Sequence, residues 1–148
     1  MSSRLLALLI AASSGLTMAL QGTLNAALGK VIGLLEATFV VHLVGLVFVS
    51  ILLFVFKLGQ GGLGLLGRAP LYSYLGGILG VIIIYTVARS IARVGVAPAT
   101  TAIILGQVLT AGLIDTCGLF GMEKLPFNWC RIGGALLLAG GAWLILRE

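Results

Sequence analysis

Six polar residues stand inside or at the ends of otherwise apolar stretches of this 148-residue chain. They are Gln21, Asn25, Glu36, His42, Gln107 and Asp115. A polar group in a membrane span is energetically costly and usually faces a cavity or a partner. The three amides are therefore predicted to bind a small polar solute through hydrogen bonds. The three ionisable groups are the candidates for coupling or gating.

Each of these residues also has a structural alternative. Gln21 and Asn25 lie four residues apart and share one helix face, but their amides could simply bond across helices. Glu36 opens an apolar span, where a carboxylate favours the positive N-terminal end of a helix. A lone histidine such as His42 more often bonds a neighbour than titrates usefully. Asp115 begins a loop and is also consistent with a helix end exposed to water.

The residues that must position these groups form five apolar stretches. They cover residues 5–28, 34–56, 71–88, 96–114 and 129–146. Each has about the 17–25 residues needed to cross a hydrocarbon core of roughly 30 Å. The chain is 60% hydrophobic and only 9% charged, and open strands would leave backbone groups unsatisfied in lipid. The sequence therefore predicts an all-α integral membrane bundle, with residues 1–148 as one five-helix domain.

Lys and Arg are distributed almost equally over the two sides of the predicted membrane spans. One set of connections carries Arg4, Lys57, Arg68, Lys124 and Arg131, and the other carries Lys30, Arg89, Arg93 and Arg147. Orientation depends on an excess of Lys and Arg on the cytoplasmic side, and 5 against 4 is almost no excess. We therefore expect insertion in both orientations and pairing into an antiparallel dimer. These charges are scattered over helix ends, where they can contact lipid headgroups. We therefore expect membrane lipid as a partner and expect no nucleic acid.

Inverting one copy would bring polar groups from both copies to one cavity. Asn25 lies in the second half of its span, and Asp115 ends the fourth span on the opposite side. In an antiparallel pair, Asp115 of one copy reaches the leaflet that holds Asn25 of the other. Gln107 is near mid-membrane in either orientation. This is the arrangement of inverted-repeat transporters, whose site lies near the bilayer midplane.

Glycines recur every seven residues in the fifth stretch. Gly133 pairs with Gly140, and Gly134 with Gly141. Small residues let helix backbones approach closely in lipid. These four glycines are predicted to pack the dimer, and ordinary packing within one protomer is the alternative.

Motifs for other chemistry are missing. Cys117 and Cys130 show no metal-ligand spacing and are interpreted as unpaired thiols. Gly62, Gly64 and Gly67 fit a dinucleotide-binding pattern, but no strand precedes them. No nucleophile elbow or pair of catalytic carboxylates is present. We expect no enzyme, no metal and no cofactor.

Three segments together resemble a known family. They are Gly15–Leu28, Gly76–Gly80 and Gly106–Gly121, the last containing Gly106, Gln107, Asp115 and Gly118. They are similar to the YdcZ-like small five-helix proteins of the drug/metabolite transporter superfamily. The resemblance implies an unfused half of an inverted repeat, which acts as an antiparallel dimer in the bacterial inner membrane. Residues 11–19 contain none of the acid that related four-helix multidrug exporters carry in their first helix.

The function expected from these observations is dual-topology transport of a small solute by alternating access. The partner is a second copy of the chain, or a related chain of opposite orientation. Two alternatives stay open at this point. One is a passive dual-topology channel for a small ion or solute. The other is a non-transporting membrane subunit that pairs with a related chain.

Overall fold

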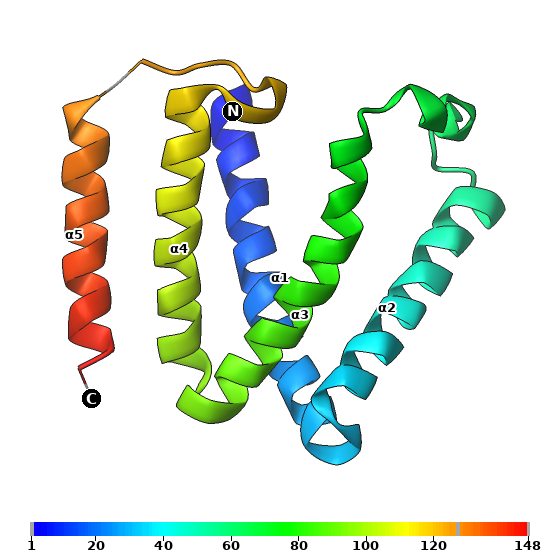
Figure 1. The fold of residues 1–148 in the computed structure, drawn as a ribbon, viewed down its shortest axis with the longest axis horizontal. Helices are drawn as coiled ribbons and strands as arrows, with labels where there is room; N and C mark the ends of the chain where they lie inside the picture. Colours follow the sequence, from blue (N-terminus) through cyan, green and yellow to red (C-terminus); the bar gives the residue numbers. More distant parts are fainter. Residues whose placement is uncertain (1, 127, 148) are drawn as a thin grey trace. The chain divides into compact units, whose positions relative to one another are not determined.

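A computed structural model describes residues 2–126 and 128–147, and within these ranges the chain is helical with no strand (Figure 1). The five α-helices are α1 (Ser3–Ile32), α2 (Leu34–Ser50), α3 (Leu75–Val94), α4 (Val96–Cys117) and α5 (Trp129–Ile145). A π-helical turn, η1 (Ile51–Val55), prolongs α2. Short 3₁₀ turns η2 (Gly62–Arg68), η3 (Leu71–Tyr74) and η4 (Leu119–Gly121) lie in the connections. The all-helical prediction is confirmed for the described residues.

In the described part of the chain, four helical segments are long and apolar enough to cross a membrane. They are Ser3–Ile32, Leu34–Val55, Leu71–Val94 and Val96–Cys117. The fifth predicted span is a shorter apolar helix, α5, of 17 residues. At about 1.5 Å per residue it is about 26 Å long, slightly less than a hydrocarbon core of roughly 30 Å. Four of the five expected spans are therefore confirmed by length and composition.

Two helices extend beyond the boundaries that hydropathy suggested. α1 continues past residue 28 to Ile32, and α3 begins after a 3₁₀ turn and continues past residue 88 to Val94. Lys30, Arg89 and Arg93 interrupt the apolar pattern at these ends. Lys and Arg are good helix formers, and their long side chains reach the interface from inside a span. The helices therefore continue past these charges and do not end at them.

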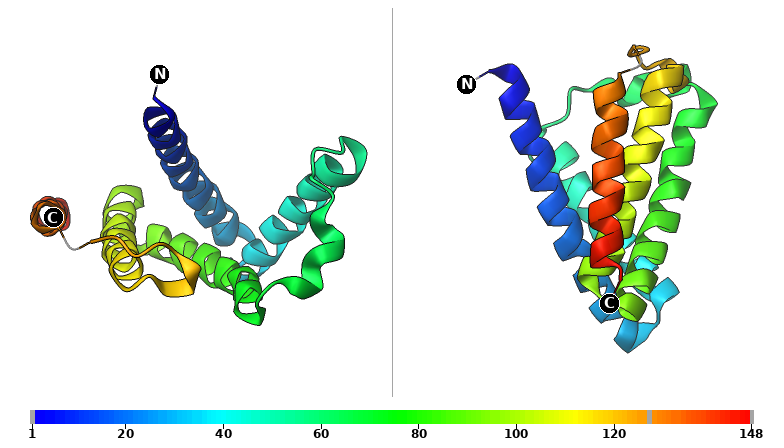
Figure 2. Two further views of the ribbon diagram at one scale, coloured as in Figure 1. Left: turned by 90° about the horizontal axis from the view of Figure 1, so that it is seen from above. Right: turned by 90° about the vertical axis from the view of Figure 1, so that its left-hand side faces the viewer.

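Contacts group the chain into two units, Met1–Arg93 and Val94–Glu148. In the first unit, α1 and α2 pack together near their connection and diverge away from it (Figures 1 and 2). Gly33 alone joins them, with φ +97°, a backbone conformation that side-chain-bearing residues rarely adopt. The Gly33 N–H donates to the Gly29 carbonyl at 3.1 Å, and the Ala37 N–H donates to the Gly33 carbonyl at 2.9 Å. One glycine therefore serves as the end of one helix and the start of the next.

The buried residues of the first unit are small. On α1 they are Gly22, Asn25, Ala26 and Gly29, which form one helix face. α2 contributes Ala37 and Thr38, and α3 contributes Ala88 and Ile91. A Cβ on Gly22 would lie 2.7 Å from Ile91 Cδ1 and 2.9 Å from Val87 Cγ1. The absence of a side chain at Gly22 is therefore what admits the side chains of α3 against α1.

In the second unit, α4 and α5 pack against each other (Figures 1 and 2). Gly118 ends α4 in the left-handed conformation, and its N–H donates to the Ile114 carbonyl at 2.8 Å. Asn128 caps α5, because its side-chain oxygen accepts the Cys130 N–H at 2.8 Å. Both ends of the polar connection are thus fixed by specific capping interactions.

Candidate functional site

The structure separates the two amides of α1. Asn25 is buried, with 6% of its surface exposed, whereas Gln21 is exposed. The buried glycines Gly22 and Gly29 lie one turn to either side of Asn25 on the same face. The helix packing that admits α2 and α3 therefore also encloses Asn25, while Gln21 stands at the edge of that face.

The amide of Asn25 has no hydrogen-bond partner among the described residues. By contrast, every completely buried side-chain nitrogen or oxygen in the described residues has a hydrogen-bond partner. The amide therefore retains a small opening to the space around it. The amide can therefore bond a ligand, a water or a second chain. Among the predicted binding residues, Asn25 is therefore the strongest candidate for binding a partner through its amide.

A cavity of about 530 Å³ opens beside α2 in the first unit. Three polar residues of α2, Glu36, Thr38 and His42, are among the residues that line it, but the surface of the cavity is almost entirely apolar. Apolar side chains complete the wall: Leu35, Phe39 and Val40 of α2 and Val81 of α3. A volume of this size lies within the range of small-molecule sites, roughly 300–1,000 Å³. The cavity thus brings together two of the predicted ionisable residues, Glu36 and His42.

Hydrogen bonds within α2 orient the polar groups of this cavity. The Thr38 hydroxyl donates to the Leu34 carbonyl at 2.8 Å. His42 Nδ1 lies 2.7 Å from the Thr38 carbonyl oxygen, and because that oxygen only accepts, Nδ1 carries the hydrogen. The other ring nitrogen, Nε2, points towards Gly80 of α3, where an added Cβ would lie 3.8 Å away. In the neutral ring, Nε2 is therefore an acceptor facing the neighbouring helix.

Glu36 has a second role at the start of α2. It is the acidic residue of the first turn, and its carboxylate folds against Gly33, since a Cβ there would meet Glu36 Oε2. A carboxylate in this position interacts favourably with the positive end of the helix. Glu36 is exposed and also lines the cavity. Its interaction with the helix end therefore does not bury the residue.

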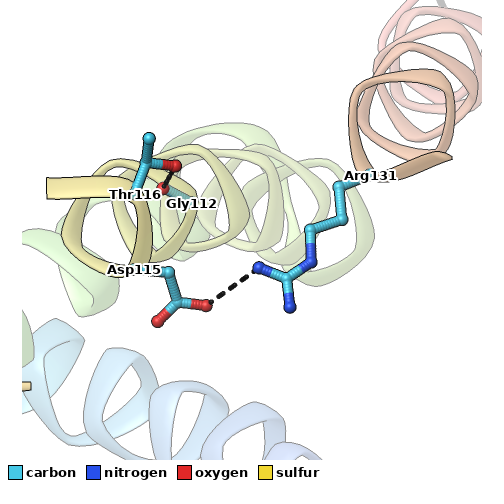
Figure 3. A network of polar contacts seen from close by, with 4 residues as sticks. All are labelled: Gly112, Asp115, Thr116 and Arg131. Carbon is cyan, nitrogen blue, oxygen red and sulfur yellow. Dashed lines mark hydrogen bonds and ion pairs between the residues drawn. The ribbon is translucent and has the colours of Figure 1, made fainter. Parts of the chain in front are cut away.

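The predicted residues of α4 belong to the second unit. Gln107 is exposed on α4. Asp115 forms an ion pair with Arg131 of α5, with Oδ2 and NH1 3.6 Å apart (Figure 3). Their side chains are 42% and 53% exposed respectively, and the Asp115 carbonyl accepts the Leu125 N–H at 2.9 Å. Asp115 is therefore tied both to α5 and to the loop between the two helices.

The four glycines of α5 do not pack closely against α4. Gly133, Gly134, Gly140 and Gly141 are all exposed, and a Cβ at any of them would meet nothing within 4 Å. The less exposed residues of α5 are Ala135, Leu138, Ala139 and Ala142. At about 100° per residue, those residues form one face; Gly133 and Gly140 lie opposite it, and Gly134 and Gly141 lie on its flank. Within the unit formed by α4 and α5, a side chain at any of these four positions would therefore meet no close neighbour.

Sequence reasoning missed three features of these sites. Thr38, four residues before His42, fixes the histidine tautomer through its carbonyl. Val81 supplies the α3 side of the cavity. Arg131 pairs with Asp115. The last had a signal in the sequence, because residues of opposite charge stand on the two helices next to the same connection.

Cys117 and Cys130 are free thiols, and no group of three His, Cys, Asp or Glu in the described ranges is placed to hold a metal ion.

Comparison with known proteins identifies the family. The sequence model described as "Putative inner membrane exporter, YdcZ" matches residues 6–144. The "Inner membrane protein YdcZ" of Escherichia coli (strain K12) is 33% identical over 148 residues, covering 97% of this chain and 95% of the relative. No solved structure matches the chain. The chain therefore belongs to the YdcZ family of inner membrane transport proteins.

Proposed function

We propose that this protein is a secondary transporter that moves a small polar solute by alternating access, as an antiparallel homodimer of five-span protomers. The observation that carries the proposal is Asn25 on the packed face of α1, a buried residue whose amide has no hydrogen-bond partner among the residues that the structure describes. A purely structural asparagine would use its hydrogen bonds within the protein. A transported solute would satisfy this amide only while it is bound.

The remaining site residues follow from pairing two inverted copies. Gln21 at the edge of the same face and Gln107 on α4 would add amides from each copy around a central path. Asp115, Glu36 and His42 would couple or gate transport. The membrane-inserted surface would contact lipid, and α5 would form the fifth span. The family description, an inner membrane exporter, supports transport as the activity.

The balance of Lys and Arg supports the antiparallel arrangement. All nine lie in connections or within about two turns of a helix end, where the orientation rule counts them. With 5 on one set of connections and 4 on the other, neither orientation is favoured. Two copies of opposite orientation would place equivalent surfaces against each other, so the inward-open and outward-open states should be equal in energy.

Orientation tests this proposal. Single cysteines are introduced as Gly64→Cys in η2, or appended after Glu148, in a Cys117→Ser, Cys130→Ser background, so that no charge changes. Intact cells are then labelled with an impermeant thiol reagent. We expect labelling of about half of the copies at each site. Full labelling at one site and none at the other would refute the homodimer and would direct the search to an oppositely oriented related chain.

A further inference from the structure

The connection between α2 and α3 is rich in exposed apolar side chains although it lies outside the membrane spans. Residues 56–70 separate the spans Leu34–Val55 and Leu71–Val94. Five of these residues have large apolar side chains, and each of the five is more than half exposed: Phe56, Leu58, Leu63, Leu65 and Leu66. A cluster of apolar side chains exposed outside a span marks a surface that contacts a membrane or a protein.

The short helix η2 sorts its residues by type. A 3₁₀ helix has three residues per turn, so residues three positions apart lie one above the other. Leu63 and Leu66 therefore form one edge of η2, which we call the leucine edge, and Gly64 and Gly67 form a second, the glycine edge. A Cβ added at Gly64 or Gly67 would meet nothing within 4 Å. One side of η2 is therefore apolar, and another carries no side chain.

A tyrosine attaches η2 to the end of a membrane span. The Tyr74 hydroxyl donates to the Leu66 carbonyl, and Tyr74 lies in η3, at the start of the span Leu71–Val94. Tyrosine is enriched where spans meet the headgroups, because its ring is apolar and its hydroxyl is polar. Since η2 is bonded to the first turn of a span, it lies close to the membrane surface.

The charges of this connection favour an anionic partner. Lys57 and Arg68 are both exposed, neither forms an ion pair with another described residue, and residues 56–70 contain no Asp or Glu. Arg68 lies three residues after Leu65, on the third edge of η2. Basic side chains next to a membrane span are attracted to anionic phospholipids. Exposed leucines together with uncompensated positive charge therefore favour a lipid surface over a position in water.

From this arrangement we infer that the connection between α2 and α3 docks on the membrane surface and binds anionic phospholipids. The leucine edge would insert among the acyl chains, Lys57 and Arg68 would contact the lipid phosphates, and the glycine edge would face water. This inference goes beyond the proposed function, since it concerns a lipid partner and requires neither the dimer nor the solute. It also keeps Gly64 accessible to the impermeant reagent that tests orientation.

Spin labels in reconstituted protein test which edge of η2 meets lipid. Single cysteines replace the residues of the two edges, as Leu63→Cys, Leu66→Cys, Gly64→Cys or Gly67→Cys, in the background without native cysteines. The vesicles consist of phosphatidylcholine with phosphatidylglycerol. Collisions with oxygen, which concentrates in lipid, are compared with collisions with a neutral water-soluble nickel chelate. We expect oxygen to collide more often at positions 63 and 66, and the nickel chelate at positions 64 and 67.

Neutralising variants test the role of anionic lipid. Each basic side chain beside an anionic surface strengthens association by about fivefold, so losing two weakens it by about 25-fold. With phosphatidylglycerol present, Lys57→Gln with Arg68→Gln should therefore raise nickel collisions at position 66 to the level found in pure phosphatidylcholine. Lys124→Gln is the control, because it removes a positive charge beside Glu123 in the connection between α4 and α5, and it should change neither collision rate. Circular dichroism checks that helix content is retained.

Equal nickel access at the two edges would overturn the inference, because the leucines would then be in water. Low access of both reagents to positions 63 and 66 would also overturn it, since protein and not lipid would then cover the leucine edge. Identical results with and without phosphatidylglycerol would refute binding of anionic lipid. Because the nickel chelate is present on both sides of the vesicles, these outcomes do not depend on orientation. They are therefore distinguishable from failure of the transporter proposal.

Discussion

Arg131 of α5 and Asp115 of α4 face each other with their charged atoms 3.6 Å apart, at the end of the pair where a polar connection joins the two helices. Both side chains are partly exposed, and such pairs contribute about 0–1 kcal/mol. We expect Asp115→Asn to lower the free energy of unfolding by less than about 1 kcal/mol. Reversible unfolding in mixed detergent measures this. The swapped variant Asp115→Arg, Arg131→Asp should recover the loss, and a much larger effect would mean that Asp115 has a buried role.

Gly33 is predicted to be intolerant of any side chain. Its φ of +97° disfavours other residues, and a Cβ would meet the Glu36 carboxylate. We expect Gly33→Ala to destabilise the protein by about 1–3 kcal/mol. Gly64→Ala is the matched control, because its φ is not positive and a Cβ there meets nothing within 4 Å. Equal unfolding free energies for the two variants would contradict the conclusion that the conformation of Gly33 is required to connect α1 and α2.

Leucine on the glycine face of α5 should separate assembly from folding. Gly134→Leu with Gly141→Leu places bulk at two positions where an added Cβ would meet nothing within 4 Å. We expect helix content to be retained and the proposed dimer to be lost, as measured by light scattering of the detergent-solubilised protein. Ala142→Leu is the control on the buried face of α5, where the residue is 3% exposed, and it should destabilise the fold itself. A dimer that survives the double glycine variant would place the contact elsewhere.

Replacing Asn25 should affect function more than stability. Asn25→Leu has similar volume and removes an amide that has no protein partner. Because no internal hydrogen bond is lost, we expect the free energy of unfolding to stay the same or rise by up to about 2 kcal/mol. Uptake of the transported solute into proteoliposomes should fall to background. Loss of folding in this variant would show that Asn25 bonds a protein group and would remove the main support for the site.

Much of the fold could be predicted because hydropathy in a membrane is a strong signal. The apolar stretches at 34–56 and 96–114 correspond closely to Leu34–Val55 and Val96–Cys117. The ends of α1 and α3 were predicted less well, because Lys30, Arg89 and Arg93 were read as boundaries. Composition alone cannot tell a charge in a connection from a charge on the last turns of a helix.

The candidate site was harder to predict because burial depends on packing. Gln21 and Asn25 are the same class of residue at adjacent turns, yet only Asn25 is enclosed. What distinguishes them is the glycines at 22 and 29, which lie one turn from Asn25 on the buried face. Likewise, the tautomer of His42 depends on a backbone carbonyl, which no residue pattern encodes.

The small size of the buried residues has a thermodynamic consequence. Among the described residues no large side chain is fully buried, and the mostly buried ones are chiefly Ala and Gly, with Ile91 the largest. A protomer with so little interior gains little free energy by folding alone. In the proposed dimer, folding and association become one equilibrium, whose midpoint shifts with the protein-to-lipid ratio. Dilution into lipid would then act on this chain as a denaturant acts on a soluble protein.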